Sequence, residues 1–205
     1  MDTAKIKRVQ YACYSANITM AVVGNLSPVL FLTFRSLYGI SFSLLGLLVL
    51  INFVTQLGVD LVFSFFSYKF NIAKTVKCIP VISLAGFLLY ALIPVLLPQY
   101  AYIGLLCGTV VFSAATGLAE VLISPVIAAL PAEDPEHEMS KLHAVYAWGT
   151  VGVIVVSTVF LLLFGGKNWF ILALLFMLVP LMSLLLFAGA QIPAMQTPER
   201  VSGAL

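Results

Sequence analysis

Six long apolar stretches, separated by short polar breaks, run along this chain of 205 residues. A helix that crosses the hydrocarbon core of a bilayer needs about twenty apolar residues. Backbone polar groups inside lipid must be satisfied within the spanning structure itself. The pattern therefore predicts an all-α membrane protein. We place its six transmembrane helices near residues 11–34, 42–66, 76–97, 101–130, 142–164 and 169–190.

The composition agrees with this class. The chain is 62% hydrophobic and 9% charged, whereas soluble domains are about 25% charged. The net charge of +2 is too small to indicate a nucleic-acid partner, and the three cysteines lack the spacing of a metal site or disulfide framework. We expect residues 1–190 to form one transmembrane domain and residues 191–205 a cytoplasmic tail or the start of a central loop.

Basic residues fall mainly on one side of the predicted topology. Lysine and arginine in short loops favour the cytoplasmic side of a membrane. With both termini cytoplasmic, only Arg35 and Lys167 lie outside. We therefore predict a multi-pass protein of the plasma (inner) membrane with both termini inside. The acidic run from Glu133 to Glu138 is expected to be a solvated loop that begins a helix. The inner basic residues are Lys5, Lys7, Arg8, Lys69, Lys74, Lys77, Lys141 and Arg200.

Polar residues within four of the spans recur at helical spacing and form stripes. Because lipid cannot satisfy such a stripe, helices one, two, four and five should surround an interior, with three and six outside them. The alternative is that the stripes only supply hydrogen bonds between helices. The stripes are Asn17, Asn25 and Ser27; Asn52, Gln56, Asp60 and Ser64; Ser113, Thr116, Glu120 and Ser124; and His143, Tyr146, Thr150 and Ser157.

Asp60 and Glu120 are acidic residues set deep in apolar stretches, with no lysine or arginine beside them in sequence. A carboxylate in a bilayer is costly, so it usually faces a water-filled cavity or an ion path. This feature indicates a solute pathway rather than an anchor. The candidate pathway residues are Glu120, Asp60, Asn25, Asn52, Gln56, Tyr146, His143 and Ser124.

The two halves of the chain also resemble each other. Ser27-Pro28 and Ser124-Pro125 stand at similar places in the first helix of each three-helix unit. Inverted three-helix repeats with broken helices near the binding site are a transporter design. We therefore expect the six helices to form two inverted three-helix repeats.

The segment GLAEVLISPVIAALPAEDPEHEMSKLHAVYAWGTVG, which starts at Gly117, resembles helices four and five of the fucose permease-like branch of the major facilitator superfamily. The six-span layout is similar to the amino-terminal half of that superfamily. The resemblance implies helices one, two, four and five around a cavity, and a second six-helix half that this chain does not contain. The matching residues are Gly117, Glu120, Ser124, Pro125, Leu142, His143, Tyr146 and Gly149.

This chain departs from the family pattern in three places. The sugar permease of that branch has an aspartate in helix one where this chain has Pro28, and Asp60 is one candidate to take its role. Where the family usually has an asparagine before the helix-four proline, this chain has Ser124. The loop motif between helices two and three is reduced to YKFNIAKT, which keeps Lys69 and Lys74.

Three classes of function are compatible with these features to different degrees. The first is a secondary active transporter, or its amino-terminal half, that moves a small polar solute, with a sugar as one candidate, by proton coupling. Glu120 would then bind protons or substrate hydroxyls, and Asn25, Asn52, Gln56 and Tyr146 would supply hydrogen bonds. The second, an intramembrane enzyme, lacks HExxH, GxSxG or paired-aspartate motifs. The third is a non-transporting subunit or truncated inactive remnant. The sequence contains no nucleotide-binding motif and indicates no cofactor or metal. The expected partners are the lipid bilayer, the solute with protons, and a second half or second copy.

Overall fold

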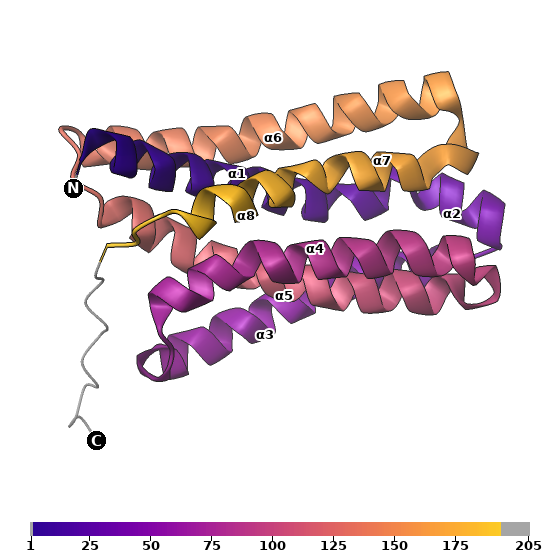
Figure 1. Cartoon of the computed structure of the whole chain (residues 1–205). Coiled ribbons are helices and arrows are strands. Elements are labelled where there is room, and N and C mark those ends of the chain that lie inside the picture. Colours follow the sequence, from indigo (N-terminus) through magenta and orange to yellow (C-terminus); the bar gives the residue numbers. More distant parts are fainter. Residues whose placement is uncertain (1, 194–205) are drawn as a thin grey trace.

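Helices account for nearly all of residues 2–193, which are the part of the chain that this computed structural model describes, and no strand occurs in that range (Figure 1). Five helices are long and apolar enough to cross a membrane, and the bent pair α1–α2 gives a sixth span. The predicted all-α membrane fold is confirmed. The helices are α1 (Thr3–Val29), α2 (Phe31–Tyr38), α3 (Phe42–Phe66), α4 (Ile72–Leu96), α5 (Ala101–Ala128), α6 (Pro135–Phe164), α7 (Trp169–Phe176) and α8 (Leu178–Ala188), with short 3-10 turns at Ser67–Lys69, Pro98–Tyr100 and Gly166–Asn168.

Two of the six spans are broken near a proline. α1 and α2 meet at an angle of 49°, with Leu30 between them, two residues after Pro28. The last span is interrupted at Met177, three residues before Pro180. Proline lacks a backbone N–H and its ring clashes with the preceding turn, which gives the break at Met177 a local cause.

The connections alternate between the two ends of an elongated bundle (Figure 1). The amino terminus, the α3–α4 turn and the α5–α6 loop lie at one end, and α2, the α4–α5 turn and the α6–α7 connection lie at the other. The first end therefore collects the basic residues predicted to be cytoplasmic, except Arg200, which lies outside the described residues. Arg35 in α2 and Lys167 before α7 lie at the opposite end. Which end faces the cytoplasm stays a prediction, as does the role of the tail, most of which lies beyond residue 193.

Glycines bring α4 and α5 unusually close together. A Cβ added at Gly86 would lie 2.5 Å from the backbone nitrogen of Phe112, and one added at Gly108 would lie 2.6 Å from the Cα of Tyr90. Small residues let helix backbones approach in lipid, where association depends on packing rather than on the hydrophobic effect. The α4–α5 pair is thus the most closely packed part of the scaffold behind the site.

Aromatic side chains hold this pair to the rest of the bundle. Trp169 of α7 packs edge-on against Phe34 of α2 with ring centroids 4.9 Å apart, and Tyr90 lies 6.1 Å from Trp169. The Tyr90 hydroxyl is 2.9 Å from the hydroxyl of Ser27 in α1. Ser27, predicted to belong to an interior polar stripe, is therefore a structural partner of Tyr90.

α3 and α6 lie at opposite edges of the bundle (Figure 1) and are its least covered spans. Leu57 in α3 is 57% exposed and Trp148 in α6 is 74% exposed. These two helices also carry parts of the polar stripes, so one side of each is apolar and open while another faces the interior.

Candidate functional site

A cavity of about 820 Å³ opens between four helices. Its lining comes from α1, α3, α5 and α6, and from none of α2, α4, α7 or α8 among the described residues. The predicted spans one, two, four and five correspond to α1 with α2, α3, α5 and α6. The prediction that these four spans surround an interior therefore agrees with this arrangement. The polar lining residues are Asn17, Asn25, Asn52, Gln56, Asp60, Thr116, Glu120, Ser124, His143, Tyr146 and Thr150.

All eight candidate pathway residues line this cavity: Glu120, Asp60, Asn25, Asn52, Gln56, Tyr146, His143 and Ser124. Their role in transport stays a prediction, because placement alone does not test it. Four members of the predicted stripes lie elsewhere. Ser64 faces outward, Ser27 contacts Tyr90, and Ser113 and Ser157 are fully buried outside the lining.

A hydrogen-bonded group fixes the α3 side of the cavity. The Oδ1 atom of Asn52 accepts from Ser113 Oγ of α5 and from Gln56 Nε2, the latter at 2.8 Å. Asn52 is only 5% exposed. Because two donors hold its oxygen, its amide nitrogen is left as a donor with no hydrogen-bond partner among the described residues. The sequence period predicts that Asn52 and Gln56 share a face, but the contact with Ser113 depends on how α3 and α5 are rotated.

The two acidic residues share the cavity without a basic partner. Asp60 is half-buried, and its Oδ1 atom is buried with no hydrogen-bond partner. Glu120 on α5 is exposed and lines the same cavity as Asp60. No lysine or arginine is among the described residues that line the cavity. The lining is therefore rich in hydrogen-bond acceptors and carries uncompensated negative charge when both carboxyl groups are ionised.

The opposite wall is formed by α1 and α6. Asn17 donates from Nδ2 to the backbone oxygen of Leu142 at 2.8 Å, which joins the two helices beside His143. Asn25 donates to the backbone oxygen of Ala21 in its own helix. Tyr146 is 40% exposed, and a Cβ added at Gly24 would lie 4.0 Å from its hydroxyl. Gly24 thus lies beside the Tyr146 hydroxyl at the cavity wall, and an added Cβ would make an ordinary contact with it.

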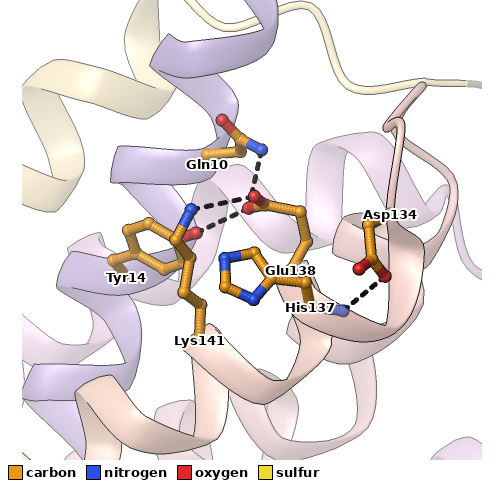
Figure 2. Close-up of polar contacts among 6 residues, drawn as sticks. All are labelled: Gln10, Tyr14, Asp134, His137, Glu138 and Lys141. Atoms are coloured by element: carbon orange, nitrogen blue, oxygen red, sulfur yellow. Dashed lines mark hydrogen bonds and ion pairs between the residues drawn. The ribbon is translucent and has the colours of Figure 1, made fainter.

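A second polar group joins α1 and α6 at the end of the bundle that holds the amino terminus (Figure 2). Glu138 accepts hydrogen bonds from Tyr14 Oη at 2.9 Å and Gln10 Nε2 at 3.0 Å, and it pairs with Lys141 Nζ at 3.0 Å. Asp134 accepts from the backbone nitrogen of His137 and caps α6. The prediction of a solvated acidic run is correct for the cap. It is wrong for Glu138, because that carboxylate contacts a helix more than a hundred residues away.

Within residues 2–193 no group of three or more His, Cys, Asp or Glu side chains is placed to hold a metal ion. The cavity lining offers hydrogen-bonding side chains and the two carboxyl groups of Asp60 and Glu120. Such a lining can bind a polar solute and can exchange protons with water in the cavity.

Comparison with known proteins identifies a similar fold. No family model and no curated protein matches the sequence at a significant level. A solved structure of the major facilitator superfamily proton:xylose symporter XylE, bound to 6-bromo-6-deoxy-D-glucose, is similar with a TM-score of 0.68 and 16% sequence identity. The match covers 88% of this chain and 45% of that one, so the chain spans about half the length of the structure it resembles. At this identity the likeness establishes the fold alone, and it agrees with the layout expected for a major facilitator half.

Proposed function

We propose that this chain is a six-helix half of a secondary active transporter, related to the fucose permease-like branch of the major facilitator superfamily, that moves a small polar solute by proton symport. A sugar is one candidate solute. The observation that carries the proposal is the cavity of about 820 Å³, lined by polar stripes from four membrane-spanning helices and containing the carboxyl groups of Asp60 and Glu120. The similar fold of a proton:xylose symporter supports it.

In this proposal Glu120 carries the coupling proton. It lies on the cavity side of α5, four residues before Ser124, which is the first residue of the Ser-Pro pair. A carboxyl group that lacks a basic partner can take up and release a proton as the cavity changes its access to water. Asn25, Asn52, Gln56 and Tyr146 supply hydrogen bonds to the solute.

The proposal includes a second six-helix unit, either another half or a second copy of this chain. α3 and α6 border the cavity and present large exposed apolar faces, as Leu57 and Trp148 illustrate. A unit packed across both helices would close the open side of the cavity. Alternating access would then be a rocking movement of the two units around the site.

The proposed orientation, with both termini in the cytoplasm, predicts the accessibility of three lysines. Cysteines placed at Lys74 and Lys141 should react with a membrane-impermeant maleimide only after the cells are opened. A cysteine at Lys167 should react in intact cells. The native cysteines Cys13, Cys78 and Cys107 would be replaced first. Labelling of position 74 but not position 167 in intact cells would show that the chain has the opposite orientation.

A monomeric chain is expected not to complete a transport cycle. The test is uptake of labelled D-xylose into proteoliposomes under an inward proton gradient, compared between preparations that are monomeric and those joined to a second unit. Cysteines at Leu57 or Trp148 should cross-link to that unit, and a cysteine at Leu88 on the outer face of α4 should not. Accumulation should follow the cross-linked fraction and disappear with a protonophore.

Two outcomes would contradict this proposal. Proton-driven accumulation by a strictly monomeric chain would show that no second unit is needed for transport. Absence of gradient-driven uptake in an assembled, folded preparation, with xylose and with a panel of neutral and charged sugars, would favour a non-transporting subunit.

A further inference from the structure

The charge of the cavity limits the kind of solute that it can hold. Asp60 and Glu120 both face it, and no lysine or arginine is among the described residues that line it. The other titratable groups on its walls are His143 and Tyr146 of α6. A neutral sugar would leave an ionised carboxylate without a counter-charge in a low-dielectric site, which is unfavourable.

Asp60 is the carboxylate best placed to hold a cationic group. Its Oδ1 atom is buried and has no hydrogen-bond partner, although buried polar atoms are almost always paired in folded proteins. An ammonium group offers three N–H donors and a positive charge, so one placed at the other oxygen, Oδ2, would supply the counter-charge that the described residues do not provide. Glu120 would remain available for the coupling proton.

Asn52 adds a second, independent requirement. Ser113 and Gln56 hold its oxygen, so its amide nitrogen is a fixed donor at the cavity wall. Asn52, Gln56 and Asp60 occupy successive turns of α3, and eight residues correspond to about 12 Å along the helix. The solute therefore needs an acceptor, such as a hydroxyl or carbonyl oxygen, some distance from its cationic end.

From these contacts we infer that the transported solute carries a protonated amino group that binds Asp60, together with hydroxyl or carbonyl acceptors that face Asn52. An amino sugar or a similar hydroxylated amine fits this description. The inference rests on the proposed transport function and names the chemical class of its solute.

The test is isothermal titration of the purified chain, in the assembly that it forms in lipid nanodiscs, with three matched probes at pH 7. D-Glucosamine tests the ammonium end, D-glucose lacks the amino group, and N-acetyl-D-glucosamine keeps the nitrogen without its charge. We expect D-glucosamine to bind at least about tenfold more tightly than either neutral sugar, since hydrogen bonds between charged groups are the stronger ones.

Asp60→Asn should reduce D-glucosamine affinity by about tenfold or more and leave D-glucose affinity unchanged. Glu136→Gln, which removes a carboxylate from the first turn of α6 outside the cavity, is the matched control and should change neither. The thermal midpoint of Asp60→Asn should not fall, because Asp60 has no partner to lose; a fall would show that the carboxylate has a structural role and would contradict the inference.

The outcomes separate the two proposals. If D-glucose binds as tightly as D-glucosamine, the inference about the ammonium group is wrong and the transport proposal stands. If the assembled, helical protein binds none of the three probes but takes up another sugar of the panel, the inference is wrong and the transport proposal stands; if it takes up none of the panel either, both are wrong.

Discussion

Replacement of Glu120 by glutamine is expected to abolish pH-driven accumulation of solute while leaving binding and exchange in place. Glutamine keeps the size and hydrogen-bonding capacity of the side chain but cannot cycle a proton. For one proton per solute molecule at zero membrane potential, a gradient of one pH unit can support about tenfold accumulation. The variant should reach a ratio of about one. Uptake into proteoliposomes, measured with and without a protonophore, gives this ratio directly.

The matched control is Asp60→Asn, the other acidic residue of the cavity. It should still accumulate a neutral solute in response to the pH gradient, because Glu120 is intact. Exchange measured at equal pH on both sides shows whether each variant still binds solute. Unchanged accumulation in Glu120→Gln would assign Glu120 a structural hydrogen-bonding role and move coupling to another group.

Gly86→Ala should cause a large loss of stability in the scaffold. The added Cβ would lie 2.5 Å from the Phe112 backbone nitrogen and 2.9 Å from its Cα, and backbone atoms cannot move aside without separating α4 from α5. Overpacking of this kind costs about 1–3 kcal/mol and occasionally more. Unfolding of the purified chain in mixed micelles, followed by circular dichroism, would measure the cost.

Gly46→Ala is the control for this substitution. It is also a helical glycine, in α3, but a Cβ there would meet no atom within 4 Å. Helix propensity alone favours alanine over glycine by up to about 1 kcal/mol, so this variant should be no less stable than the parent. Equal stability of the two variants would mean that the α4–α5 contact can relax, and that it is not the rigid part of the scaffold.

Hydropathy predicted the spans well where the apolar stretch and the helix end together. The range 42–66 coincides with α3, since Ser41 caps its start and a polar turn follows Phe66. It failed where a helix continues beyond the apolar stretch. α1 begins at Thr3, eight residues before the predicted start, and α6 begins at Pro135 rather than at residue 142. Asp134 followed by proline at the first helical position was a usable start signal for α6.

From the sequence, the candidate site could be predicted only as far as which residues share one face of a helix. Helical periodicity is enough to group Asn52, Gln56 and Asp60 on one side of α3. Contacts such as Ser113 with Asn52, or Tyr14 with Glu138, depend on the rotation and offset of separate helices. Those are set by close packing along glycines and aromatic rings, and no periodicity within one helix contains that information.

The contacts of Glu138 also bear on how the chain is assembled in the membrane. Tyr14 and Gln10 are synthesised with the first helix, but their partner lies 124 and 128 residues further along the chain. During synthesis α1 must therefore stay in place with these two polar side chains facing water, lipid headgroups or the insertion machinery until α6 has been made. In ribosome-bound chains that end before residue 138, α1 should be weakly attached to the other helices. In chains that extend past α6, it should be firmly attached.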